Sequence, residues 1–203
     1  MWNGGTISDP LIMHWDGSTT TQLGEPWCWY DEPDIHGGEV VWSGYDNGTV
    51  NIFYWDGSST TMIDHDWISD DCPQIHNGQI AWQGFDFDNE IYYWDGSTVT
   101  QITNNSYDDD PPQIYDGAVV WSGYDGTDYE IFYWYDGTTY QVTNNDWHDW
   151  DPQIWNRQIT WESYVDGAGS QIMEAHVPEP ATLAMFGLGL AGLAAKLRRR
   201  RKS

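Results

Sequence analysis

The stretch DPPQIYDGAVVWSGYDGTDYEIFYWYDGTTYQVTNN, residues 110–145, decides the fold. It contains four short apolar or Thr-rich runs, at 112–115, 118–123, 130–135 and 139–143, separated by turn residues. Asp-Gly between alternating apolar runs is a strong signal for a β-hairpin. The stretch therefore predicts four short antiparallel strands and no helix.

The same pattern recurs along the chain with a period of about 40 residues. Its three markers are Pro before the first strand, Trp in the second strand and Asp-Gly after the third. They occur at Pro33, Pro73, Pro112 and Pro152; at Trp42, Trp82, Trp121 and Trp161; and at Asp16-Gly17, Asp56-Gly57, Asp95-Gly96 and Asp136-Gly137. Four strands in a repeat of this length are typical of a β-propeller blade, and the regular period argues against a sandwich.

These markers, with the Thr-rich fourth strand that ends Val142-Thr143-Asn144-Asn145, resemble the WD40-like repeats of TolB-type propellers. The resemblance covers residues 1–176 and implies an all-β propeller of about four blades of four antiparallel strands. Its periods lie near 33–72, 73–111, 112–151 and 152–176. Met1-Trp2-Asn3-Gly4 aligns with the end of a second strand and does not have the pattern of a signal peptide, so we expect the first blade to be partial. We therefore expect either a four-bladed ring or a fragment of a larger propeller.

The C-terminal segment 177–203 has a different character. Val177-Pro178-Glu179-Pro180 excludes a helix, residues 181–195 are uncharged and mostly apolar, and a basic cluster from Lys196 to Lys202 follows. Leu197 and the long basic side chains extend this run toward the length of a membrane helix, which we expect at about 181–197. By the positive-inside rule the basic end stays in the cytoplasm and the acidic body lies outside.

This tail resembles the PEP-CTERM sorting signal, which implies that an exosortase is the processing partner. The residues that carry the resemblance are Val177, Pro178, Glu179, Pro180, Arg198, Arg199, Arg200 and Arg201. The resemblance implies a Gram-negative bacterium, a precursor tethered in the inner membrane, and a mature protein at the cell surface or outside the cell. It also implies an association with exopolysaccharide and biofilm.

The charge of the chain is strongly segregated. The formal net charge is −25, six of the seven basic residues lie in the last eight positions, and Arg157 is the remaining one. Nucleic acid would be repelled by so acidic a body, whereas cations and neutral polyhydroxylated partners would not. Cys28 and Cys72 lack the spacing of a zinc site, and an exported protein permits, without requiring, a disulfide between them.

In an antiparallel blade the fourth-to-first and second-to-third loops share one face, and most acids fall in these loops. Carboxylates at close range suit Ca²⁺. The candidate cation ligands are Asp70, Asp71, Asp108, Asp109, Asp110, Asp125, Asp128, Asp149 and Asp151. Tryptophans beside carboxylates suit sugar rings, through stacking and hydroxyl hydrogen bonds. The candidate glycan-binding residues are Trp27, Trp29, Trp67, Trp147 and Trp150.

A purely architectural interpretation stands beside both. Tryptophans can wedge between blades, as we expect above all for the periodic ones, and Asp can serve turns. The sequence contains no Gly-x-Ser-x-Gly, His-Glu-x-x-His or Cys-His nucleophile pattern, so no catalytic residue is predicted. We expect a non-enzymatic protein that binds or scaffolds polysaccharide or protein at the cell surface. The alternatives are a fragment of a carbohydrate-active enzyme and a TolB-like protein-binding propeller.

Overall fold

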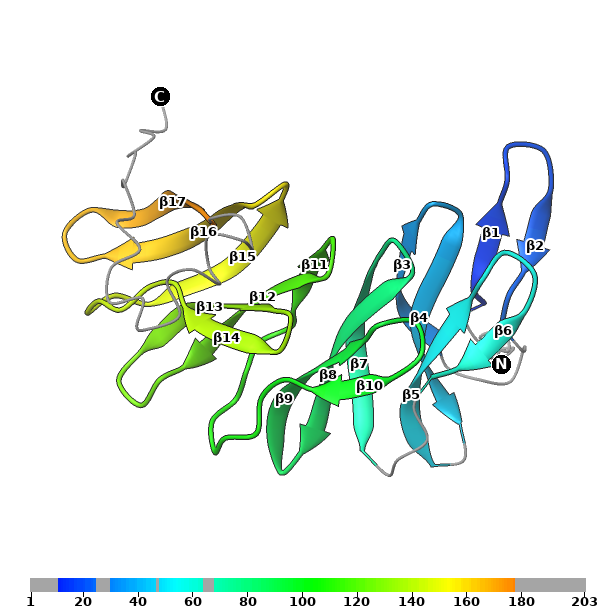
Figure 1. The fold of residues 1–203 in the computed structure, drawn as a ribbon, viewed down its shortest axis with the longest axis horizontal. Helices are drawn as coiled ribbons and strands as arrows, with labels where there is room; N and C mark the ends of the chain where they lie inside the picture. Colours follow the sequence, from blue (N-terminus) through cyan, green and yellow to red (C-terminus); the bar gives the residue numbers. More distant parts are fainter. Residues whose placement is uncertain (1–10, 25–29, 47, 64–67, 178–203) are drawn as a thin grey trace, which may run out of the picture.

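A computed structural model describes residues 11–24, 30–46, 48–63 and 68–177, with no side-chain detail for residues 30 and 31. The described residues form strands and turns without a helix, arranged as five antiparallel sheets in a row (Figure 1). The predicted C-terminal helix lies outside the described residues. No helix in the described part is long and apolar enough to span a membrane.

Three of the sheets have four strands, and the sheets at the two ends of the row have fewer. The first is β1 (Met13–Trp15) and β2 (Thr20–Gln22). The second is β3 (Tyr30–His36), β4 (Glu39–Asp46), β5 (Thr49–Trp55) and β6 (Thr60–Met62). The third is β7 (Ser69–His76), β8 (Gln79–Asp86), β9 (Asp88–Trp94) and β10 (Val99–Gln101).

The fourth sheet is formed by residues 110–145: β11 (Gln113–Tyr115), β12 (Ala118–Tyr124), β13 (Tyr129–Tyr135) and β14 (Thr138–Gln141). The last is β15 (Asp149–Trp155), β16 (Gln158–Val165) and β17 (Gly169–His176). Each predicted strand of 110–145 is present within two residues of its expected ends. The tight turns have the expected chemistry, since Asp116 and Gly117 have φ of 50° and 78° and Asp136 and Gly137 have 47° and 76°.

One expectation about the first strands was wrong. Asp70, Asp71, Asp149 and Asp151 were assigned to loops, but they lie within β7 and β15, which begin before the proline. A β-bulge makes this possible, because the register shifts between Asp71 and Gln74 and between Trp150 and Gln153. Cys72 and Asp151 take positive φ at the bulges, and the proline that follows each of them escapes a ladder position.

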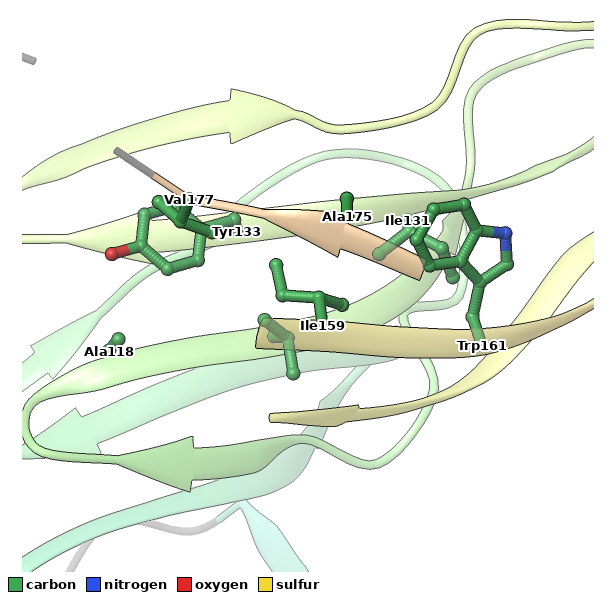
Figure 2. Close-up of a cluster of buried hydrophobic side chains, with 8 residues drawn as sticks. Ala118, Ile131, Tyr133, Ile159, Trp161, Ala175 and Val177 are labelled. Atoms are coloured by element: carbon green, nitrogen blue, oxygen red, sulfur yellow. The ribbon is translucent and has the colours of Figure 1, made fainter. Parts of the chain in front are cut away.

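The core consists of side chains packed between neighbouring sheets. In the last cluster, Ile159, Trp161 and Ala175 face Ile131 and Tyr133 of the preceding sheet (Figure 2). The second-strand tryptophans Trp42, Trp82, Trp121 and Trp161 are at most 2% exposed. The predicted wedging between blades is therefore confirmed for these four.

The third-strand tryptophans pack against the preceding sheet. Trp55 lies 4.8 Å from His14, Trp94 5.2 Å from Tyr54 and Trp134 4.8 Å from Tyr93, between ring centroids. Trp15 is at the equivalent position of the first sheet. It is 68% exposed, because no sheet precedes it among the described residues. Trp2 lies 40 residues before Trp42 and so shares the period of the second-strand tryptophans, but it lies outside the described residues.

Candidate functional site

The candidate site lies where the last two sheets meet, on the face formed by the β12–β13 and β14–β15 connections. Tyr124 and Tyr129 are paired next to the β12–β13 connection, as the last residue of β12 and the first of β13. The backbone N–H of Tyr164 donates to the carbonyl of His148, which ties the β14–β15 connection to β16. The predicted sharing of one face by these two kinds of loop is borne out here.

Five aromatic rings form a continuous strip on this face, which we call the aromatic strip: Tyr107, Tyr124, Tyr129, His148 and Trp150. Ring centroids are 5.3 Å apart for Tyr107 and Tyr124 and 5.6 Å for Tyr124 and Tyr129. Tyr129 lies 6.3 Å from Trp150, whose ring is stacked on His148 at 5.3 Å with an interplanar angle of 2°. Tyr107 is 43% exposed and the indole of Trp150 is half-buried, so the strip faces solvent in part.

Carboxylates surround the strip. Burial first, and then the charges of Asp110 and Asp108, raise the pKa of Tyr129 above its ordinary value. The phenol therefore stays protonated at neutral pH and keeps its O–H as a hydrogen-bond donor. Asp108 accepts the backbone N–H of Asn89, and Asp110 accepts the Ser122 hydroxyl at 2.8 Å. The site thus combines ring faces, a phenolic donor and carboxylate acceptors.

Other candidate aspartates serve the architecture. Asp70 accepts a hydrogen bond from Trp82 Nε1 at 3.0 Å, and Asp109 accepts one from Trp121 Nε1 at 2.9 Å. Both carboxylates are at most 4% exposed. Burial raises the pKa of Asp109 to about 6, against the lowering effect of its hydrogen bonds. Asp70 and Asp109 therefore hold buried indoles rather than face solvent.

The last sheet lacks this bond although Asp149 and Trp161 stand at the equivalent positions. Asp149 Oδ1 and Trp161 Nε1 are buried without a hydrogen-bond partner. The reason is a neighbouring residue: the third and fourth sheets have Gly84 and Gly123, where the last sheet has Ser163. A Cβ at Gly84 would lie 2.7 Å from Asp70 Oδ1, and one at Gly123 would clash with Asp109 Oδ1. The carboxylate reaches the indole only where glycine leaves room.

A second group of carboxylates converges at the β12–β13 connection, which Tyr124 and Tyr129 flank. Asp125, Asp128 and Glu130 each offer one oxygen, and these oxygens lie within 4.8 Å of one another. Glu130 is fully buried and Asp128 is 5% exposed. Burial, more than the nearby charges of Asp149 and Asp128, raises the pKa of Glu130 to about 7. Burial also raises the pKa of Asp128, and the charge of Asp125 adds to the effect.

Among the candidate cation ligands, the structure thus brings Asp125 and Asp128 together with Glu130. Asp71 accepts the N–H of Cys72 and shares a second, more exposed group with Glu32 and Cys72. Among the candidate tryptophans, Trp150 belongs to the aromatic strip. Trp147 lies in the β14–β15 connection, and its backbone N–H donates to Asn145 Oδ1. The remaining candidates lie outside the described residues: Trp27, Trp29 and Trp67, Cys28, whose pairing with Cys72 the sequence left open, and the sorting residues after Val177.

Five residues of the site were not predicted from the sequence: Tyr107, Tyr124, Tyr129, His148 and Glu130. A signal for Glu130 was available in the repeat itself, because the equivalent positions hold Asn51, Glu90 and Gln171. The position tolerates neutral amides, so an acid there is not required by the fold. The tyrosines give no such signal, because aromatic residues are abundant in every repeat.

Comparison with known proteins places both parts of the chain. Residues 176–201 match the model of the PEP-CTERM protein-sorting motif. The body is similar to TolB from Acinetobacter baumannii, with a TM-score of 0.59 and 14% identity over 82% of this chain and 46% of that one. It is also similar to a putative TolB from Agrobacterium tumefaciens, with a TM-score of 0.59 and 14% identity over 82% of this chain and 70% of that one.

A third similar structure is the propeller domain of the Trilobed protease from Pyrococcus furiosus, described as having an open velcro topology. Its TM-score is 0.60 at 11% identity, over 77% of this chain and 54% of that one. This chain spans only part of the length of these proteins. It covers 46% of the Acinetobacter TolB, 54% of the Trilobed protease domain and 30% of a further similar structure, an acylaminoacyl peptidase from Pyrococcus horikoshii. At these identities the likeness concerns the fold alone.

No curated protein matches the sequence. The sorting motif implies a secreted, exosortase-processed protein of the Gram-negative cell surface. The chain therefore combines a β-propeller body, similar in fold to TolB, with a PEP-CTERM sorting motif at its C-terminal end.

Proposed function

We propose that this protein binds exopolysaccharide at the cell surface, through the aromatic strip, and so acts as a scaffold in the extracellular matrix. The observation that carries the proposal is the strip itself, with five contacting rings beside carboxylates. Sugar rings present apolar C–H faces and a rim of hydroxyls. Aromatic faces match the former, and Asp acceptors with the Tyr129 donor match the latter.

The charge of the body narrows the ligand class. The described surface around the strip is acidic, with Asp108, Asp110 and Asp125 close by. Such a surface disfavours strongly anionic polymers and favours neutral or weakly charged polysaccharides. We also propose binding without catalysis: Asp109 and Asp149 accept hydrogen bonds from protein groups, and Asp125, Asp128 and Glu130 crowd one another rather than flank a cleft.

Trp150→Ala is expected to weaken binding to polysaccharide about tenfold, the equivalent of about 1.4 kcal/mol for a lost stacking contact. The measurement is co-sedimentation of the full chain with exopolysaccharide isolated from the bacterium that produces it. Trp155→Ala is the matched control. Trp155 lies at the other end of the same strand, is 68% exposed and belongs to the opposite face. Equal affinity of the two variants would refute the strip as the binding site.

A further inference from the structure

In the four sheets whose second and third strands are both described, one position next to the second-to-third connection is neutral twice and acidic twice. Asn51 and Gln171 occupy it in the second and last sheets, and Glu90 and Glu130 in the third and fourth. Asn51 Nδ2 donates to the carbonyls of Thr49 and Asp46, at 3.2 and 3.4 Å. Gln171 Nε2 donates to the carbonyls of Ser170 and Ala168, at 2.8 and 3.1 Å. In both sheets the side-chain amide therefore donates hydrogen bonds to backbone carbonyl oxygens of this connection.

Glu130 cannot play that part, because a carboxylate has no N–H to donate. Its Oε1 accepts the backbone N–H of Asn145 at 2.6 Å, which fixes the side chain in place. Its Oε2 is buried without a hydrogen-bond partner, and the Thr143 hydroxyl lies near enough to the carboxyl to lower its pKa, against the larger effect of burial. A buried carboxylate oxygen left in this way costs free energy unless a proton or a cation satisfies it.

The β12–β13 connection itself, residues 125–128, supplies further carboxylate oxygens. Asp128 Oδ1 is also buried without a partner. Asp125 is exposed, and its Oδ1 accepts the N–H of Thr127 at 2.9 Å, which holds the carboxylate over the turn. Two oxygens that each lie about 2.4 Å from one Ca²⁺ are at most about 4.8 Å apart. The three oxygens of Asp125, Asp128 and Glu130 meet this limit as they stand.

We propose that Asp125, Asp128 and Glu130 form a Ca²⁺ site that closes the connection between β12 and β13. Three carboxylates leave room for water and carbonyl oxygens, which suits the six to eight ligands of Ca²⁺ better than the strict octahedron of Mg²⁺. Exposed Asp125 provides the route of entry. The site lies at the connection that Tyr124 and Tyr129 flank.

The third sheet provides an internal comparison. Glu90 is 2% exposed and its Oε2 is likewise buried without a partner. However, the connection is shorter there, and Asp86 and Asp88 are paired across the ends of β8 and β9. In the described part of the chain, the carboxylates of this connection converge only in the fourth sheet. We therefore expect one site rather than one per repeat, and Glu90 is a matched control for Glu130.

The test is isothermal titration of the full chain with Ca²⁺ alone, in mild detergent and without polysaccharide. Wild type is expected to show one saturable site of about 10⁻⁴–10⁻³ M, the range of extracellular Ca²⁺ modules. Glu130→Gln is expected to weaken that site roughly tenfold or more, since affinity follows the number of charged ligands. Glu90→Gln is expected to bind as wild type does.

Glu130→Gln places in the fourth sheet the residue that the last sheet already has, so we expect it to fold. Asp125→Asn, at an exposed position, is the second variant and should weaken binding in the same way. The absence of saturable binding by wild type, equal effects of Glu130→Gln and Glu90→Gln, or an unchanged affinity of Asp125→Asn would each overturn the proposal. Because no glycan is present, failure here is distinct from failure of the proposed function.

Discussion

Trp121→Ala is expected to lower the free energy of unfolding by about 3–5 kcal/mol, the usual cost of removing a buried large aromatic residue. The indole is 1% exposed and packs between the third and fourth sheets with Ala81, Ile91 and Tyr93. It is also stacked on Phe132, with centroids 5.7 Å apart. Since domains are stable by only about 5–15 kcal/mol, this one change would remove a large part of the total.

The hydrogen bond of Trp121 can be separated from its packing. Trp121→Phe removes the indole donor to Asp109 Oδ1 and leaves this buried carboxylate one hydrogen bond short. Trp161→Phe makes the same change in the last sheet, where the indole has no hydrogen-bond partner. Chemical denaturation should show Trp121→Phe to be the more costly by about 1–3 kcal/mol. Equal losses would mean that the Asp109–Trp121 bond contributes nothing measurable.

With a chelator present, stability is expected to fall as the pH rises from about 4 to about 8. Burial raises the pKa of Asp109 to about 6 and of Glu130 to about 7, from ordinary values of 3.8 and 4.5. Between the ordinary and the raised values the folded chain holds more protons than the unfolded chain. The stabilisation is thus complete at the acidic end and is lost as the pH rises through the folded pKa values. Each group contributes at most about 3 kcal/mol.

Thermal melts across this pH range, for wild type and Glu130→Gln, check the prediction. The variant has no carboxyl group at residue 130, so it should lose that share of the pH dependence and be the more stable protein at pH 8 in chelator. Asp125 and Asp128 on the β12–β13 connection, and Asp149 on β15, face Glu130 and remain in both proteins. Identical slopes, or a wild type that gains stability toward pH 8, would contradict the account.

The strands were predictable because the repeat presents the same signals several times. Asp-Gly at the turns and apolar residues in the second and third strands act locally, so a single stretch, residues 110–145, sufficed. The bulged starts of β3, β7 and β15 were not predictable. These aspartate-rich segments before proline become strands because they pair with the second strand of their sheet. That pairing depends on the register between the two strands and not on the local preference of the residues.

The candidate site was only partly predictable, for a related reason. Composition pointed to acids and aromatic residues on the correct face, and Trp150, Asp125 and Asp128 were among those chosen. Composition alone could not distinguish aspartates that accept a hydrogen bond from a buried indole from aspartates whose carboxylates converge on one another. That distinction depends on a single neighbour, as glycine at Gly123 and serine at Ser163 show.

We expect the acidic propeller body to act outside the cell after its sorting motif has been processed. The most direct measurement is an immunoblot of fractionated cells with an antibody against the body, in the native host with and without its exosortase. We expect a shortened chain in the surface or extracellular fraction of the first strain, and full-length chain in the membrane fraction of the second. A full-length chain in the cytoplasm of both strains would contradict the claim.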